Sequence, residues 1–273
     1  MRNHRVLDDP AVLHGHDHAE WCGLRANDFT RLAAAVFGAA DNERLMLVGT
    51  SADLDEVRNN PRLDRLAANG ALTVHTLDEV YGDVSTFDPV QQLQTFTAIV
   101  FEALGQGYRG LRVVADATPM ISGTEDTFSR WLAWEHLADQ LIDARPVVGV
   151  CYFDDAAVEP ERLEALSALH PITHGRELAP PFRLFTDDGV LVVTGEIDDE
   201  TISTLHLALA ARPRTPGGLI VDLAHADFID HRTLQAFARL GTRSAPVQVH
   251  GVHPTLRRLW QTLDLTTDTL HLN

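Results

Sequence analysis

In the first two thirds of the chain, stretches with a helical spacing of apolar residues alternate with short, continuous apolar runs. Segment 44–49 is such a run, closed by Gly49. Short apolar runs bounded by glycine are typical of buried strands, and longer periodic stretches are typical of amphipathic helices. The pattern predicts helices at 27–40, 62–69, 89–105, 127–144 and 161–169, and strands at 44–49, 71–76, 111–115 and 147–152. This alternation predicts an α/β fold with a doubly wound parallel sheet, in which ligands bind at the carboxyl ends of the strands.

The last third of the chain follows a different order. Strand-like residues on both sides of Asp187-Asp188-Gly189 predict a β-hairpin at 182–195. The pattern then predicts helix 201–211, strand 219–223, helix 233–244, strand 247–251 and helix 254–263. A hinge is predicted between residues 175 and 182, because Ala179-Pro180-Pro181 should form a short, stiff spacer. We therefore predict two domains, 1–178 and 182–273, the second with a mixed sheet and helices.

The composition fits an ordered protein, since 45% of the 273 residues are apolar and the length is sufficient for two domains with separate cores. No stretch approaches the roughly 20 apolar residues that span a bilayer, and the N-terminal segment has no apolar signal core. The cytoplasm is therefore the expected location, without membrane contact. Cys151 lies in the apolar run 147–152, which favours a buried, reduced thiol over a disulfide with Cys22.

The formal charge of −17 is unevenly distributed, with −14 on residues 1–181 and −3 on residues 182–273. An acidic first domain disfavours direct nucleic-acid binding. The chain contains no lysine, which excludes a catalytic amine and the lysine of a phosphate-binding loop. Segment 49–53 stands where such a loop would follow a strand, but Thr50-Ser51 is better explained as a helix N-cap. A degenerate nucleotide-binding module stays an alternative, and no cofactor is expected.

Several polar residues close to the N-terminus raise a metal hypothesis: His14, His16, Asp17 and His18. In an extended segment residues 14, 16 and 18 face the same way, and imidazole is a standard zinc ligand. The segment resembles the His-x-His-x-Asp-His motif of metallo-β-lactamase-like hydrolases but is one residue shorter. A metal-dependent hydrolase is therefore an alternative function. A structural or ligand-facing role of Asp17 and His18 without a metal is favoured, because a His-rich tract permits metal binding without requiring it.

A second candidate site consists of charged residues within apolar segments: His18, Arg112, Asp116 and Glu135. Arg112 lies inside a predicted buried strand, where a cation needs a carboxylate partner, and Asp116 or Glu135 is expected to supply it. Asp116 ends that strand, at the position where α/β folds place ligand contacts. The four residues are interpreted either as the polar part of a small-molecule pocket or as an architectural ion pair.

Five segments carry a resemblance to a known family: Asp17-His18, residues 107–114, Trp134-Glu135-His136, residues 150–154 and His170-Pro171. In order and spacing they are similar to the MEDS domain, a sensory module related to RecA/KaiC-like ATPases. The resemblance spans most of residues 12–175. It implies a RecA/KaiC-like parallel sheet with flanking helices and a regulatory input domain. The family's ligand is proposed to be a small organic molecule or is unknown.

The order of elements in 182–273 resembles a STAS domain, the fold of anti-sigma factor antagonists. In that family a loop typically reads Asp-Ser-Ser-Gly-Leu, and its second serine accepts a phosphate. This chain has Asp230, His231, Arg232 and Thr233 at those positions, so that Arg232 replaces the acceptor. The loop is expected to bind a partner without a phospho-switch, and Thr233 is expected to cap the helix that follows.

Together the two resemblances predict a non-enzymatic signalling protein. Its input is a small ligand or a partner bound by the MEDS-like domain, and its output is protein contact through a degenerate STAS domain. The expected partners are an anti-sigma factor, a serine-kinase-like protein or another STAS protein, and the chain itself in a homo-oligomer.

Overall fold

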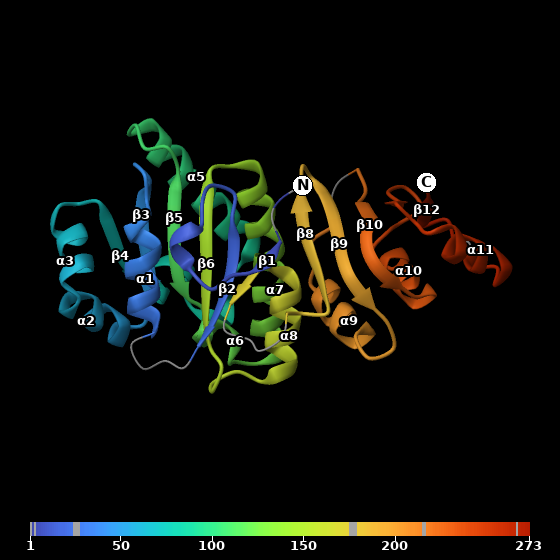
Figure 1. Ribbon diagram of the computed structural model, residues 1–273, viewed down its shortest axis with the longest axis horizontal. Helices are drawn as coiled ribbons and strands as arrows, with labels where there is room; N and C mark the ends of the chain where they lie inside the picture. Colours follow the sequence, from blue (N-terminus) through green and yellow to red (C-terminus); the bar gives the residue numbers. More distant parts are fainter. Residues whose placement is uncertain (1, 3, 24–27, 175–178, 215–216, 266) are drawn as a thin grey trace.

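A computed structural model describes residues 2, 4–23, 28–174, 179–214, 217–265 and 267–273. Within these residues the chain forms an α/β fold with two sheets (Figure 1), as predicted. All strand pairs of the first sheet are parallel. Its strand order is β1 (Arg5–Val6), β7 (Ile172–His174), β2 (His18–Gly23), β6 (Val147–Asp154), β5 (Leu111–Asp116), β3 (Arg44–Gly49) and β4 (Leu72–Thr76).

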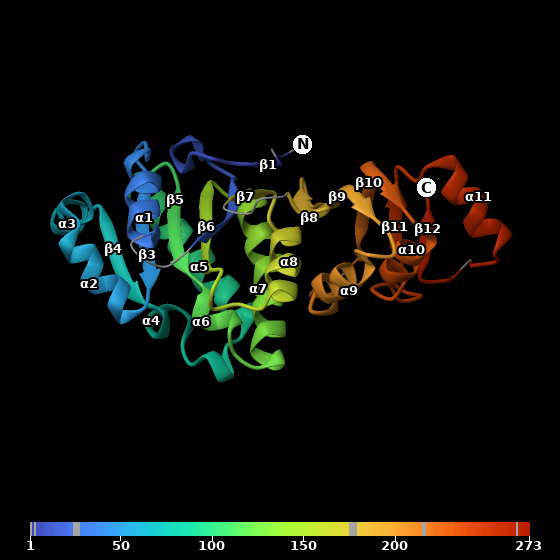
Figure 2. The same ribbon diagram turned by 60° about the horizontal axis from the view of Figure 1, so that its bottom comes forward.

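Helices cover both faces of the first sheet (Figure 2). The helices and 3-10 turns of this part are η1 (Pro10–Val12), α1 (Asp28–Gly38), α2 (Ser51–Asn59), α3 (Pro61–Ala68), α4 (Leu77–Tyr81), η2 (Val84–Thr86), α5 (Pro89–Gly105), α6 (Thr118–Ile121), α7 (Glu125–Ala144) and α8 (Pro160–Leu169). Along β5, Val113 and Ala115 pack in the core with α5, α7 and α8, whereas Val114 packs in the core with α1, α2 and α3. The alternation of side chains along each strand thus separates two cores, one on each face of the sheet.

The second sheet is mixed, because β8 pairs antiparallel with β9 while the other pairs are parallel. Its strand order is β12 (Leu270–Leu272), β11 (Val247–His250), β10 (Ile220–Ile229), β9 (Val190–Ile197) and β8 (Phe182–Asp187). Its helices are α9 (Ile202–Ala210), α10 (His231–Ala238) and α11 (Pro254–Thr262). The predicted hairpin is confirmed, and its turn has positive φ at Asp188 (52°) and Gly189 (77°), as a type I′ turn requires.

Two boundaries in the second sheet differ from the sequence prediction. β10 continues to Ile229, six residues beyond the predicted strand end, and α10 covers 231–238 instead of 233–244. The reason is local: the Asp230 carboxylate accepts hydrogen bonds from the backbone N–H groups of Arg232 and Thr233 and so begins the helix two residues earlier. The predicted partner-binding loop is therefore the N-cap and first turn of α10.

The two sheets share one continuous apolar core through α7 and α8, which lie between β6 and β8 in Figure 1. Helix α8 contacts both β8 and α9, and α7 contacts β8. At the edge of this interface the Asp143 carboxylate accepts the backbone N–H groups of Asp188 and Gly189. The predicted hinge begins in residues 175–178, which lie outside the described residues. No helix in the described part of the chain is long and apolar enough to cross a membrane.

Candidate functional site

Polar side chains are buried on the face of the first sheet that α5, α7 and α8 cover. His18 and Glu20 are two residues apart on β2 and therefore point to the same face of the sheet. The strand register places Glu20 beside Cys151 of β6. Glu135 enters from α7, and His170 directly follows α8. The side chains other than Cys151 are at most 1% exposed. Two strands and two helices thus bring ionisable groups that are distant in sequence into one apolar core.

Four of these residues form a compact group, which we call the polar cluster: His18, Glu135, Cys151 and His170. Glu135 Oε2 lies 3.4 Å from His18 Nε2 and 3.5 Å from His170 Nε2. The Cys151 thiol lies 3.9 Å from the same oxygen. The imidazole rings of His18 and His170 have centroids 4.3 Å apart. One atom from each residue lies within 4.8 Å of the other three, so the four side chains point at a common centre.

Both histidines of the polar cluster are held by the ring nitrogen that faces away from the centre. His18 Nδ1 lies 3.3 Å from Asp139 Oδ1, and His170 Nδ1 donates to the backbone carbonyl of Leu166 over 2.8 Å. This leaves both Nε2 atoms directed at Glu135. His170 Nε2 is buried and makes no hydrogen bond with any described residue.

The electrostatics of the polar cluster follow from burial and mutual contact. Burial lowers the pKa of His18, but hydrogen bonds with Asp139 and Glu135 outweigh this and leave it raised. Burial raises the pKa of Glu135, but His170 and His18 bring it below its ordinary value. Burial and the nearby His18 lower the pKa of His170 to about 4, so this ring is neutral at pH 7. Burial and Glu135 raise the pKa of the Cys151 thiol well above its usual range.

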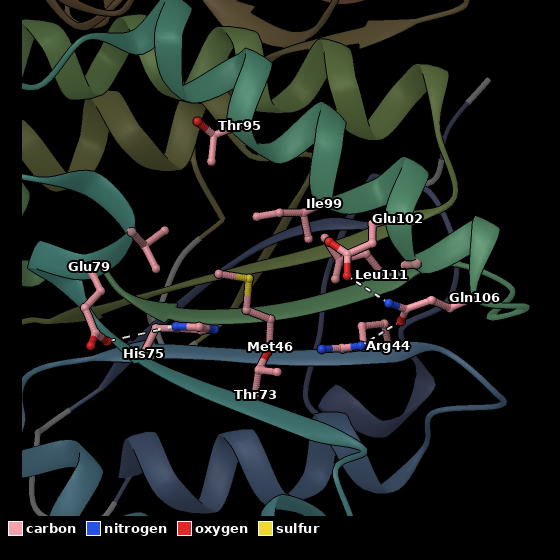
Figure 3. A pocket seen from close by; sticks show the side chains of 12 residues that line it. Arg44, Met46, Thr73, His75, Glu79, Thr95, Ile99, Glu102, Gln106 and Leu111 are labelled. Carbon is pink, nitrogen blue, oxygen red and sulfur yellow. Dashed lines mark hydrogen bonds and ion pairs between the residues drawn. The ribbon is translucent and has the colours of Figure 1, made fainter.

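Several cavities border the first sheet, and two of them lie on the face that α5 and α7 cover. A small one of about 40 Å³ reaches His18 and Cys151 and is otherwise walled mainly by apolar side chains. A larger one of about 290 Å³ lies between β3, β4 and α5 (Figure 3). At its wall Arg44 donates to Gln106, which donates to Glu102, each over 2.8 Å. These three side chains form hydrogen bonds with one another. The polar cluster borders the small cavity and not the larger one.

The structure brings together only two of the four residues predicted to line a pocket. His18 and Glu135 meet, but Arg112 and Asp116 do not reach them. Arg112 donates to the carbonyl of Leu13 and pairs with Glu43 at 2.7 Å, on the face that α1 covers. The prediction that Asp116 or Glu135 is the partner of Arg112 was wrong. Arg112 lies on the face of β5 opposite to α7, which carries Glu135. Asp116 is on the same face as Arg112 but four residues further along the strand, roughly 13 Å away.

Asp116 serves the local backbone, since its carboxylate accepts the N–H of Thr118 at the start of α6. Sequence reasoning missed Cys151 and His170 as cluster residues. Both lie in segments that carry the MEDS resemblance, but strand β2 was not predicted. Without β2 as the neighbour of β6, no pattern indicated that His18 and Cys151 share a face.

The three histidines of segment 14–18 do not face the same way. His16 has a positive φ of 72° within a turn, and only His18 begins the strand. His14 is exposed and pairs with Asp17 at 2.8 Å, while His16 Nδ1 lies 2.8 Å from the carbonyl of Ile142. The alternation on which the metal hypothesis for these histidines depended is absent, because the turn interrupts the extended segment.

Helix α7 joins the polar cluster to the second sheet. The buried Asp139 carboxylate contacts His18 through Oδ1, accepts a hydrogen bond from Arg2 over 2.8 Å, and accepts the backbone N–H of Thr186 in β8 over 2.5 Å. His136 donates to the carbonyl of Ala208 in α9 over 2.8 Å.

The second ring nitrogen of His136, opposite the one that donates to Ala208, accepts a hydrogen bond from Arg212 over 3.0 Å. Burial and the Arg212 charge lower the pKa of His136 to about 3, so the neutral ring donates from one nitrogen and accepts at the other. Helix α7 therefore contacts the polar cluster and the second sheet through adjacent turns.

The first turn of α10 is firmly held. Arg232 forms ion pairs with Asp230, at 2.6 Å, and with Asp199. Hydrogen bonds to these two carboxylates raise the pKa of Arg232. Thr233 is fully buried, and its hydroxyl lies 3.4 Å from Asp230. The prediction that Thr233 caps the helix was wrong, because Asp230 takes that position.

A groove of about 800 Å³ lies beside this turn. It is lined by the carboxyl end of β10 and the starts of α10 and α11, with His231 at its wall. Phe228 and Leu259 line it and are 53% and 41% exposed, respectively. Exposed large apolar side chains that gather at a groove are typical of a protein contact.

Segment 49–53 has the structure of a helix start. Thr50 caps α2, and the Asp53 carboxylate accepts the Thr50 backbone N–H over 2.7 Å and its hydroxyl over 2.6 Å. The interpretation of Thr50 as an N-cap is confirmed. An internal carboxylate thus already accepts the Thr50 N–H and hydroxyl, two donors that a phosphate at this position would use.

The fold and the site define an α/β protein whose first sheet gathers ionisable side chains in a buried cluster joined by one helix to a second sheet. The family model of the MEDS domain, the MEthanogen/methylotroph, DcmR Sensory domain, matches residues 17–171. The chain belongs to this family, and membership indicates a sensory, signalling role. The match contains all four residues of the polar cluster and ends before the second sheet.

Among solved structures, the chain is similar to the flagellar accessory protein FlaH from Methanocaldococcus jannaschii. The similarity covers 66% of this chain and 76% of FlaH, with 12% sequence identity and a TM-score of 0.37. With this identity and TM-score, the similarity to FlaH indicates no function for the chain. The specific likeness to RecA/KaiC-like ATPases stays a prediction. No curated protein matches the chain.

Proposed function

We propose that this chain is a non-enzymatic sensory regulator. The first sheet receives an input at the polar cluster, and the second sheet delivers the output by contact with a protein. The observation that carries the proposal is the position of Asp139, whose carboxylate touches His18 of the cluster and the backbone of Thr186 in β8. A change at the cluster therefore has a direct mechanical route to the second sheet.

The packing around α7 supports this route. Glu135 and Asp139 are one turn apart on α7, and both contact His18. Between them in sequence, His136 contacts α9. Because protein interiors are close-packed, a shift of this helix cannot be absorbed locally and must move its neighbours.

For the output, we propose a degenerate STAS-like domain that binds an anti-sigma factor or a serine-kinase-like protein. The order hairpin, helix, strand, helix, strand, helix supports this resemblance. The groove beside Asp230 and His231, with exposed Phe228, is the proposed contact surface. Arg232 has no hydroxyl and Thr233 is buried, which supports control by the first sheet instead of by phosphorylation of this turn.

The test is capture of partners from native cell extract on full-length protein, followed by mass spectrometry. We expect an anti-sigma factor or its kinase on the wild type and on Ile220→Asp. Phe228→Asp should reduce capture about tenfold or more, which corresponds to a loss of about 1.4 kcal/mol. Ile220 is the matched control, because it is 43% exposed on the same strand but distant from the groove. Capture of no such protein, or equal capture by Phe228→Asp, contradicts the proposed output.

A further inference from the structure

We propose that the polar cluster binds one divalent transition-metal ion, with Zn²⁺ as the matching ion. The ligands are His18 Nε2, His170 Nε2, a Glu135 carboxylate oxygen and the Cys151 sulfur. Two imidazoles, a thiolate and a carboxylate are the donors that Zn²⁺ binds in proteins. Four protein ligands complete a tetrahedral shell, which is typical of a closed site and not of a catalytic one.

The distances agree with one ion at the centre. Metal–ligand bonds of about 2.0–2.3 Å in a tetrahedron place neighbouring donor atoms roughly 3.3–3.8 Å apart. The two Nε2 atoms lie 3.4 and 3.5 Å from Glu135 Oε2, and the Cys151 sulfur lies 3.9 Å from it. All other pairs of these donor atoms lie within 4.8 Å of one another, so side-chain shifts of up to about 1 Å close the tetrahedral shell.

The surroundings orient the ligands in the way that metal sites require. A metal-bound histidine usually donates its other ring nitrogen to a carboxylate or a backbone carbonyl. His18 has Asp139 in this position, and His170 has the carbonyl of Leu166. His170 Nε2 is a buried polar atom without a hydrogen bond among the described residues, and such atoms are costly unless a ligand satisfies them.

The charges also balance. A dication with one thiolate and one carboxylate is neutral, which lowers the cost of burying it in an apolar core. Binding releases the thiol proton of Cys151 and any proton held by His18 to solvent, because both side chains bind a metal in their deprotonated forms. No electron transfer is involved.

The chain carries matched controls for each ligand type. Cys22 is the other cysteine of the chain. It is buried on the face of β2 that carries His18, and it bonds to Glu20 outside the metal centre. His16 is an exposed histidine close in sequence to His18. If substitutions in the polar cluster abolish metal binding and substitutions of Cys22 and His16 do not, the metal site is assigned to the cluster.

The experiment is equilibrium dialysis of reduced, full-length, chelator-treated protein against Zn²⁺, with bound metal counted by mass spectrometry. We expect one Zn²⁺ per chain for the wild type, Cys22→Ser and His16→Gln. Cys151→Ser and His170→Gln should weaken binding more than about 100-fold, beyond the 10–100-fold cost of losing an outer-shell partner. Substoichiometric wild-type binding, or unchanged binding by both cluster variants, overturns the proposal.

Cobalt gives a second readout that does not depend on the variants folding equally well. Wild-type protein with Co²⁺ should show a thiolate-to-metal charge-transfer band, which Cys22→Ser keeps. His170→Cys replaces one ligand by another and should retain Co²⁺ with a stronger thiolate band. A wild-type spectrum without thiolate character contradicts the assignment of Cys151.

The role of the ion as the sensory input rests on the proposed function, whereas its binding does not. Partner capture is therefore repeated with Zn²⁺ and with chelator. Stoichiometric Zn²⁺ with metal-dependent capture supports both proposals. Zn²⁺ binding with capture that ignores the metal retains the site and refutes its signalling role. Specific capture without Zn²⁺ binding retains the proposed function and refutes the metal site.

Discussion

Replacement of Asp139 by alanine tests the link between the polar cluster and the second sheet. The side chains of Asp139 and its partner Arg2 are 5% and 8% exposed, respectively. Removal of one partner from a buried ion pair leaves the other charge uncompensated and costs about 3–5 kcal/mol. For a chain of this length, that corresponds to a fall in Tm of roughly 6–15 °C.

The assay is urea unfolding of full-length protein at pH 7, followed by tryptophan fluorescence, to which the buried Trp131, Trp134 and Trp260 contribute. Asp143→Ala is the matched control, because Asp143 also accepts two backbone N–H groups from the second sheet but lies at an exposed edge. We expect Asp143→Ala to cost about 1 kcal/mol or less. Equal costs for the two variants would refute the reasoning that Asp139 is the buried link.

The loss of stability caused by Asp139→Ala should change with pH in a definite direction. Burial raises the pKa of Asp139, but Arg2, His18 and the Thr186 N–H bring it well below its ordinary value. A carboxylate with a lowered pKa contributes stability that is fully present above its unfolded pKa of about 3.9. The penalty of Asp139→Ala should therefore be complete at pH 7 and shrink as the pH falls below about 4. A penalty that grows in acid contradicts this account.

Three further outcomes are expected. Asp230→Ala should lower stability by about 1 kcal/mol in urea unfolding because α10 loses its N-cap, while Asp230→Asn keeps the cap; equal losses contradict this. Incubation with ATP and a cognate-type anti-sigma kinase should leave the buried Thr233 unmodified, and a phosphopeptide that contains it would defeat this expectation. Calorimetric titration with MgATP should show no saturable heat, because the Asp53 carboxylate holds the donors of Thr50; saturable binding would restore the nucleotide alternative.

The periodicity of the chain predicted most of the first sheet, because its strands and helices are long or bounded by clear signals. Strand β3 and helix α5 have the predicted ends, and β5 and β6 are one and two residues longer than predicted. Strands β1, β2, β7 and β12 were missed. β1, β7 and β12 have two or three residues, too few for any period, and β2 interleaves His18 and Glu20 with apolar residues. Buried polar residues break the apolar signal on which strand prediction depends.

Only half of the candidate site was predicted. Sequence reasoning selected Glu135 and His18 but grouped them with Arg112, because distance along the chain does not indicate the face of a sheet. The face is decided by alternation within each strand and by the register between strands, and the second of these is a long-range property. Cys151 joined the cluster only when β2 and β6 were seen as parallel neighbours.

We propose that the position of the polar cluster lets a deeply buried site affect a distant surface. Glu135 and Asp139 hold the two nitrogens of the same His18 ring, one at 3.4 Å and one at 3.3 Å. Any ligand that draws Nε2 toward the cluster centre therefore pulls on Asp139 through a rigid ring. Asp139 is also held on its other side, because its second oxygen accepts the backbone N–H of Thr186. In the proposed mechanism β8 follows this movement, and the hydrogen-bonded sheet connects β8 through β9 and β10 to the groove beside Phe228.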